Sequence, residues 1–321
     1  MDGRHSRSAD GFPVKPTGST ATHHPWRTTP MPNQFLNPAE VAALANELVR
    51  ADGLVPFVGR SAGQHFKPGI GATVDIRKPA VLKARTREVG SVEAITADTL
   101  TEAYQSVTIT EQAYSAVDLT DADLTLNLAD FGRQVLAPQA LAVAEYANDA
   151  IVDKLETVTA DATLSGAYDA ANPVRTFTAA RKQLRQLRLP AAEMLAVVGT
   201  DVYADMLDSG AFDPDGSRGD LIRSIRGFAV VESNRIAAND IFVYMREAVQ
   251  LVSVAPAAPR GAGSAQVVTR DGLSIMSIMD YDARTLQDRS VLSVFLGVGL
   301  VTVRRADTGA DVTPVVRITT A

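Results

Sequence analysis

The sequence contains no cysteine, so disulfide frameworks, thiolate metal sites and cysteine nucleophiles are excluded. Histidine is almost as scarce. Three of the four histidines lie within the first 30 residues, and His65 is the fourth. A histidine-rich metal centre in the rest of the chain is therefore excluded, and a Ser-His-Asp triad could use only His65.

Long apolar runs are missing as well. The longest one, residues 290–303, is interrupted by serine and glycine and is shorter than the roughly 20 residues that a membrane span needs. Residues 1–30 contain no apolar segment of the kind found in secretory signals. We predict that they are a disordered or non-native leader and that the natural start is Met31.

The composition is typical of a globular protein. Of the 321 residues, 46% are hydrophobic and 21% are charged, which is enough to form one large domain or roughly two to three intertwined ones. The 37 acidic and 31 basic residues give a formal net charge of −6. This acidic balance does not favour nucleic-acid binding through overall charge.

Helices are predicted where apolar residues recur every three or four positions. One of about fifteen residues begins at Pro38 and stops at Gly53, one of about 25 residues follows Pro138, and one begins at Pro173 and ends before Pro190. Their expected buried faces are Val41, Leu44, Ala45 and Leu48 in the first, Leu141, Ala144, Ala147, Ile151, Leu155 and Val158 in the second, and Val174, Phe177, Ala180, Leu184 and Leu187 in the third.

Two segments with strand patterns flank a long charged connection. Residues 73–78 alternate apolar and polar side chains, and a second strand is predicted over 106–110, continuing to 117. The roughly 25 residues between them are too many for a tight hairpin. We therefore predict a two-stranded projection with a charged tip, which needs a neighbour to lie against because an isolated ribbon is marginally stable.

The remaining chain, from residue 190 on, alternates short strands with one or two short helices and lacks a regular βαβ rhythm. The predicted fold class is therefore α+β.

Four clusters of residues have compositions that could form chemical sites. The glycines at 69 and 71 precede a strand rather than following one, so a turn is favoured over phosphate binding. The segment 213–216 lacks the glycine and glutamate that complete a calcium loop. The other two clusters are the aspartates Asp118, Asp121, Asp123 and Asp130, and the basic helix face Arg181, Lys182, Arg185 and Arg188.

Each of these two clusters has two interpretations. The aspartates are either turn and cap residues or, as the alternative, paired carboxylates for acid–base chemistry. The basic face is either solvated or intersubunit, or, as the alternative, a contact for nucleic-acid phosphates.

The order of segments then becomes the informative feature. The chain resembles the major capsid proteins of tailed bacteriophages, above all the podophage coat-protein branch with the Hong Kong 97-like (Johnson) fold. The segments that carry the resemblance are MPNQFLNP from Met31, GATVDIRKP from Gly71, VTIT from Val107, DLTDADL from Asp118, the long helix after Pro138, GLS from Gly272 and MDYD from Met279.

The resemblance implies a division of the chain. Residues 31–66 would form an N-terminal arm and 67–116 an extended β-hairpin loop, the E-loop, that overlaps a neighbouring subunit. A peripheral domain would comprise 117–189 and 266–321, with the long helix as its spine. Residues 190–265 would form an axial domain.

It also implies a function. Subunits would assemble into pentamers and hexamers of an icosahedral shell that encloses double-stranded DNA, in the virion and assembled in the host cytoplasm. A scaffolding protein, a portal and a decoration protein are the further expected partners, with no membrane, no cofactor, no metal and no enzymatic activity. We expect the intersubunit ion pairs to involve Arg77, Lys78, Lys83, Arg85, Arg87 and Glu88.

Two alternatives stay open. An encapsulin-type nanocompartment shell protein would share this fold. A protein of a different class, a soluble hydrolase, would use the aspartate cluster near Asp118.

Overall fold

The computed structural model describes residues 38–51, 53–62, 73–78, 82, 84–92, 94–97, 103–109, 111–120, 132–189, 193–212, 223–261, 264–305 and 308–320. The predicted leader 1–30, His65, the glycines at 69 and 71 and the segment 213–216 lie outside these residues. No helix in the described ranges is long and apolar enough to cross a membrane.

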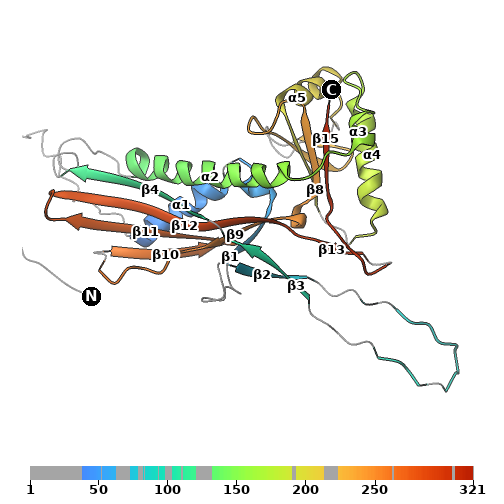
Figure 1. The fold of residues 1–321 in the computed structure, drawn as a ribbon, viewed down its shortest axis with the longest axis horizontal. Coiled ribbons are helices and arrows are strands. Elements are labelled where there is room, and N and C mark those ends of the chain that lie inside the picture. The colour runs from blue at the N-terminus through green and yellow to red at the C-terminus, as the bar shows by residue number, and fades with distance from the viewer. Residues whose placement is uncertain are drawn as a thin grey trace, which may run out of the picture. The chain divides into compact units, whose positions relative to one another are not determined.

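The larger of two main sheets is built around one long strand, β12. Antiparallel β11 and then β9 lie along one edge of β12, and antiparallel β4 lies along the other. β10 extends the sheet beyond β11, and β1 extends it in parallel beyond β9 (Figure 1). The strands are β1 (Gly59–Ala62), β4 (Glu111–Thr120), β9 (Val249–Val254), β10 (Ser264–Arg270), β11 (Leu273–Asp282) and β12 (Gln287–Leu300).

Helix α1 (Pro38–Ala51) packs on β10 and β11 of this sheet. It begins at Pro38, as predicted, and Gly53 follows it with a φ of +52°. Of the predicted buried stripe, Ala45 is buried, whereas the predictions for Leu44 and Leu48 are wrong because both are exposed, and the side chain of Val41 lies outside the described ones. Among the described side chains of the helix, the buried ones are Ala42, Ala45, Asn46 and Val49. Asn46 donates a hydrogen bond to the Leu273 carbonyl at 2.8 Å. The buried face of α1 therefore includes a polar residue, and a pattern of apolar residues alone does not identify this face.

Helix α2 (Ala137–Glu156) covers β12 and β4. Of its predicted apolar face, Ala144, Ala147, Ile151 and Leu155 are buried, whereas Leu141 is exposed. Buried Asn148 also faces inward and accepts a hydrogen bond from the Leu54 backbone at 2.8 Å. The buried face of α2 is therefore shifted slightly from the predicted one. It includes Asn148, since a polar side chain can be buried when it is hydrogen-bonded.

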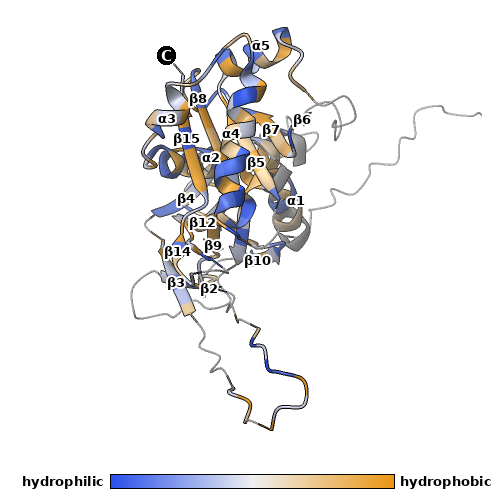
Figure 2. Cartoon of the chain, turned by 90° about the vertical axis from the view of Figure 1, so that its right-hand side faces the viewer, coloured by the Kyte–Doolittle hydropathy of each residue, from blue (hydrophilic) through white to orange (hydrophobic). Residues whose placement is uncertain are grey.

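The second sheet has the order β15-β8-β5-β7-β6 and its own core. Figure 2 shows that its strands β5, β8 and β15 are largely hydrophobic. Three helices belong to this core, and Phe177 of α4 meets Phe228 of β7 edge-to-face at 6.2 Å. The elements are α3 (Ala162–Ser165), α4 (Pro173–Gln186), α5 (Thr200–Asp208), β5 (Met194–Val198), β6 (Arg223–Ile225), β7 (Phe228–Glu232), β8 (Asp240–Met245) and β15 (Val315–Thr319).

The predicted division, in which the peripheral domain comprises two separate segments, stays a prediction, and the two sheets do not follow its boundaries. β9 falls in the predicted axial range 190–265 but belongs to the larger sheet. α4 and β15 fall in the predicted peripheral ranges 117–189 and 266–321 but belong to the second core. α1, assigned to the arm 31–66, packs on the larger sheet. The chain crosses between the two sheets several times, so continuous segments do not describe its layers.

A buried ion pair lies where α2 ends against the second sheet. The Arg317 guanidinium donates to the Asp240 carboxylate at 2.7 and 3.1 Å and to the Glu156 carbonyl at 2.9 Å. The Thr319 hydroxyl donates to the other Asp240 oxygen at 2.7 Å. Asp240 is fully buried, so these contacts supply the partners that its charge requires.

Short elements complete the described chain. Helical turns lie at Val55–Phe57, Gly132–Leu136 and Arg246–Ala248. Two small antiparallel pairs remain, β2 (Thr73–Lys78) with β3 (Ala103–Thr108), and β13 (Val303–Arg304) with β14 (Asp311–Val312).

Candidate functional site

The pair β2–β3 is a ribbon that projects from the larger sheet, as predicted (Figure 1). Its register runs from Thr73 opposite Thr108 to Lys78 opposite Ala103. The predicted second strand is divided in two: β3 ends at Thr108, and β4 begins at Glu111 within the larger sheet. The described residues 82, 84–92 and 94–97 beyond the ribbon form no helix or strand.

Two glycines of β12 form a seat for the base of the ribbon. A Cβ atom at Gly297 would lie 2.6 Å from the Thr108 carbonyl oxygen, and one at Gly299 would lie 2.4 Å from a Val107 methyl group. Val107 and Val74 of the ribbon are buried in a small cluster with Val252 of β9. Only glycine therefore allows the ribbon to lie this close to β12.

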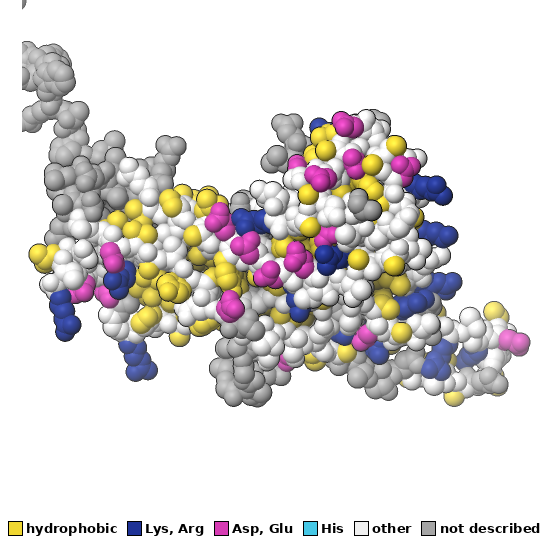
Figure 3. Space-filling model, turned by 45° about the horizontal axis from the view of Figure 1, so that its top comes forward, with side chains coloured by type: hydrophobic (Ala, Val, Ile, Leu, Met, Phe, Trp, Pro, Cys, Tyr) yellow, Lys and Arg dark blue, Asp and Glu magenta, His cyan; other side chains and the backbone are white. Residues whose placement is uncertain are grey.

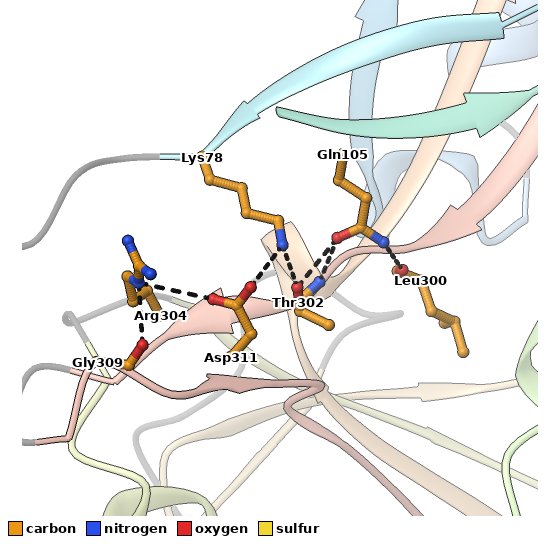
Figure 4. Close-up of polar contacts among 7 residues, drawn as sticks. All are labelled: Lys78, Gln105, Leu300, Thr302, Arg304, Gly309 and Asp311. Carbon is orange, nitrogen blue, oxygen red and sulfur yellow. Dashed lines mark hydrogen bonds and ion pairs between the residues drawn. The ribbon is translucent and has the colours of Figure 1, made fainter. Parts of the chain in front are cut away.

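A polar clamp holds the ribbon farther along, through Lys78 at the opposite end of β2 and Gln105 of β3 (Figure 4). The Lys78 ammonium donates to the Asp311 carboxylate at 3.0 Å and to the Thr302 hydroxyl at 2.5 Å. The Gln105 side chain donates to the Leu300 carbonyl at 2.8 Å and accepts from the Thr302 backbone at 2.9 Å. Seat and clamp together fix the direction in which the ribbon leaves the sheet.

The clamp changes the role of one expected intersubunit residue. Lys78 is only 12% exposed and pairs with Asp311 of its own chain, so we remove it from the candidates for contacts with a neighbour. Arg77 is exposed on β2, whereas Lys83 lies outside the described residues.

The far end of the ribbon carries a tight turn with exposed apolar side chains. The Glu88 carbonyl accepts a hydrogen bond from the Ser91 backbone at 3.2 Å, and Gly90 supplies the positive φ of +86° that such a turn requires. Val89 and Val92 are fully exposed. Figure 3 shows hydrophobic, basic and acidic side chains close together on the projecting segment at the right.

The remaining expected intersubunit residues lie on this turn or just before it. Arg85, Arg87 and Glu88 are all exposed. Leu82 and Ile95 add exposed apolar side chains on the two flanking segments. A group of exposed apolar residues bordered by charge is typical of an interaction surface. We call residues 85–92 the tip.

A groove of about 590 Å³ opens beside the ribbon base, between β3, the end of β12 and α2. β4 pairs with β12 only as far as Leu296, and no other described strand pairs with that edge of β12 beyond it. On the opposite wall, the Tyr146 hydroxyl donates to the Glu111 carboxylate. Burial and this carboxylate raise the pKa of Tyr146 to about 12, so the hydroxyl remains a donor at neutral pH.

Sequence reasoning missed this groove, since its walls come from three distant segments. The signal that could have indicated it is the pair Gly297 and Gly299 within an otherwise apolar strand, because glycine in a strand marks a close approach of another backbone.

Of the aspartate cluster, only Asp118 lies in the described residues, and its partner there is an arginine. Asp118 lies directly opposite Arg289 across β4 and β12, with contacts of 2.5 and 3.1 Å. The hydrogen bond from Arg289 holds the pKa of the Asp118 carboxyl below its ordinary value. A general acid at neutral pH needs a raised pKa instead. Asp121, Asp123 and Asp130 lie outside the described residues.

The Asp118 pair makes a pH-dependent prediction. We expect a carbon-13 NMR titration to give a pKa for Asp118 below 3.8, and Arg289→Gln to return it toward 3.8. Because the folded pKa is depressed, the stabilisation from this pair is present above the unfolded value and is lost as the pH falls through the folded value. A titration of Asp118 above 3.8 in the unmodified protein would contradict this assignment.

The basic face of α4 is partly a structural contact. Arg181 donates to the Arg226 carbonyl of the second sheet, whereas Lys182, Arg185 and Arg188 are exposed. Across the described part of the chain, histidine and acidic side chains form no group of three that could hold a metal ion.

The sequence matches no family model and no curated protein, but solved structures share its fold. A chain in the capsid structure of the cyanophage P-SCSP1u is 14% identical, with a TM-score of 0.50 over 82% of this chain and 86% of that chain. The chain has the Hong Kong 97-like fold of phage capsid proteins.

Other similar structures have lower scores. A chain of Mycobacterium phage Che8 is 18% identical, with a TM-score of 0.48 over 83% of this chain and 90% of that one. A virus-like particle from Pyrococcus furiosus is 8% identical, with a TM-score of 0.47 over 87% and 97%.

The Hong Kong 97-like fold confirms the fold class predicted from the order of segments. The podophage branch within the fold stays a prediction.

Proposed function

We propose that this chain is the major capsid protein of a tailed bacteriophage, which assembles into pentamers and hexamers of an icosahedral shell around double-stranded DNA. One observation carries the proposal: the ribbon ends in the fully exposed apolar side chains of Val89 and Val92. Burying one valine side chain contributes about 1.5–3 kcal/mol, so the tip favours contact with another surface over water. The Hong Kong 97-like fold supports this function.

Assembly would depend on repetition. Each exposed ion pair at the tip contributes only about 0–1 kcal/mol, but the same contact recurs at every subunit of a symmetric shell. Weak contacts also allow misplaced subunits to leave before the shell closes. The function is structural rather than enzymatic, in the virion capsid.

Further partners belong to the same proposal. A scaffolding protein and a portal would act during assembly in the host cytoplasm, and a decoration protein would bind the finished shell. Packaged DNA would be contacted without sequence preference, and the assembly needs no cofactor.

Size-exclusion chromatography and negative-stain electron microscopy of the purified chain test the proposal. We expect particles of megadalton mass with icosahedral outlines. A monomer or small oligomer under all assembly conditions, with scaffolding protein supplied, would overturn it. The encapsulin-type alternative predicts packaged cargo enzyme instead of DNA in shells isolated from cells.

Reversing the charges of the tip is a direct test of its role. The double variant Arg85→Glu/Arg87→Glu is expected to reduce the assembled fraction at least about tenfold, since two repeated ion pairs of up to 1 kcal/mol each are replaced by repulsion. The monomer should remain folded, with an unchanged circular dichroism spectrum. Shells formed by this variant at the unmodified yield would show that these arginines are not intersubunit contacts.

A further inference from the structure

Helix α4 carries several cations and no anion of its own. Its 14 residues include four basic side chains and neither aspartate nor glutamate. Opposite charges three or four residues apart pair on a helix surface, and α4 lacks the acidic half of every such pair. Arg175, Lys182 and Arg185 are exposed, and their side chains make no ion pair within the described part of the chain. The outer side of α4 is therefore a cationic surface whose counter-charges must come from elsewhere.

Helix α2 presents the opposite charge on its exposed side. Glu145, Asp149, Asp153 and Glu156 are exposed, and at 3.6 residues per turn they lie within about 80° of one another around the helix axis. We call these four residues the acidic face of α2. The first two are in contact with Arg235, at 3.8 and 2.5 Å. The last two make no ion pair among the described residues.

The two faces match in spacing as well as in sign. Asp153 and Glu156 are three residues apart on α2, which separates them by about 4.5 Å along the helix axis. Lys182 and Arg185 have the same separation on α4. Opposed charge patterns of this kind fix the register of an interface and exclude wrong partners more than they add affinity.

The two helices belong to opposite sides of the second sheet. Alternate residues of a strand point to opposite faces. In β8, Phe242 and Tyr244 belong to the core that contains the buried face of α2, and Ile241 and Val243 belong to the core of α4. In Figure 1 this sheet lies between α4, at the right, and the end of α2. The basic face of α4 therefore cannot reach the acidic face of its own α2.

We propose that the basic face of α4 in one subunit lies against the acidic face of α2 in the next subunit, so that the occupant of each face is a second copy of this chain. The residues that meet are Lys182 and Arg185 on one side and Asp153 and Glu156 on the other. The inference rests on the proposed function and adds a contact that does not involve the ribbon. Because the two faces are different surfaces of one chain, the contact is heterologous, and it generates a closed ring when its rotation closes.

A zero-length cross-linker tests the contact directly. A carbodiimide joins a lysine amine to a neighbouring carboxylate through an amide bond, without a spacer. Subunits labelled with nitrogen-15 are mixed with unlabelled ones before assembly, so a link between the two isotopes must join two chains. We expect mass spectrometry of the assembled particles to find Lys182 linked to Asp153 or Glu156 between isotopes. Assembled particles without this link would overturn the inference.

Lys182→Arg is the matched control for the cross-link. It keeps the positive charge and removes the amine that the carbodiimide needs. This variant should assemble like the unmodified chain and lose the link between isotopes. A link that persisted in it would belong to another lysine, and the assignment to α4 would be wrong.

A charge exchange provides a second readout. Lys182→Glu/Arg185→Glu is expected to reduce the assembled fraction about tenfold. Asp153→Lys/Glu156→Lys should do the same, and the combination of all four should restore most of it. Each variant is first checked for an unchanged thermal midpoint. Folded variants in which the combination assembles no better than either pair alone would overturn the contact.

The control for the charge exchange changes the net charge elsewhere. Arg260→Glu/Arg284→Glu reverses two exposed arginines outside α2 and α4 and should leave assembly unchanged. An equal loss from this control would mean that net charge alone is responsible, which would overturn the inference.

Binding of α4 to packaged DNA predicts a different result. Lys182→Glu/Arg185→Glu would then form shells at the unmodified yield. The affinity of the unmodified subunit for a double-stranded DNA oligonucleotide would depend on these two side chains and fall steeply with salt. This pair of results would also overturn the contact between copies.

The outcomes separate this inference from the proposed function. If the unmodified chain forms shells but neither the cross-link nor the charge exchange involves α4, the capsid function stands and the contact is wrong. If the unmodified chain forms no shells, the capsid function fails. The cross-link between isotopes in its soluble oligomers then decides whether the two faces meet.

Discussion

Gly297→Ala is expected to abolish shell assembly while both sheets remain folded. The added Cβ would lie 2.6 Å from the Thr108 carbonyl oxygen and 3.1 Å from the Ile109 Cα atom. Both are backbone atoms, which cannot rotate away as a side chain can, so the base of the ribbon must move. Overpacking of this kind costs about 1–3 kcal/mol. Hydrogen exchange of β2 and β3, together with electron microscopy, measures the two effects.

Gly261→Ala is the matched control. This glycine has open space around its Cβ position and no positive φ, so the same substitution should leave exchange, stability and assembly unchanged. If Gly297→Ala formed normal shells, the seat on β12 would not determine the direction of the ribbon.

Asp240→Ala is expected to lower the free energy of unfolding by about 3–5 kcal/mol. It removes the carboxylate that the Arg317 guanidinium and the Thr319 hydroxyl contact at 2.7 Å, and leaves a partly buried cation without its counter-ion. Chemical denaturation measures the change in the free energy of unfolding.

The control for Asp240→Ala is Glu47→Ala, which removes the exposed ion pair between Glu47 and Arg270. Both side chains are about half exposed, at 52% and 54%, so Glu47→Ala should change stability by only about 0–1 kcal/mol. Similar losses for the two variants would mean that the Asp240 pair does not join the end of α2 to the second sheet. Replacing Asp240 and Arg317 together with apolar residues should be much less harmful than Asp240→Ala alone.

Local signals in the sequence predicted much of the fold. The prolines at 38 and 173 mark the first residues of α1 and α4, because proline fits the first helical position. Alternation over 73–78 predicted β2 with its bounds, and the length of the charged connection predicted the projecting ribbon. These features depend on neighbouring residues only, which is why one sequence suffices for them.

Features of the fold that depend on contacts between residues far apart in the chain were not predicted from the sequence. Asn46 and Asn148 are buried because partners far along the chain satisfy them, so the apolar pattern placed Leu44 and Leu141 on the wrong face. The membership of β9 and β15 in the two sheets is decided by long-range pairing. Lys78 had the charge of an intersubunit contact, and only the position of Asp311 shows that its partner is internal.

The ribbon is anchored by two interactions of different physical origin, and solution conditions can separate them. The valines on the glycine seat are held by the hydrophobic effect, which weakens on cooling. The ammonium of Lys78 and its half-exposed carboxylate partner are held by Coulomb attraction, which dissolved ions screen. Cold should therefore loosen the seat and concentrated salt should loosen the clamp. The ribbon should therefore be most mobile in subunits kept in cold buffer of high salt concentration. Warming the subunits and removing the salt by dialysis should hold the ribbon in its original direction again.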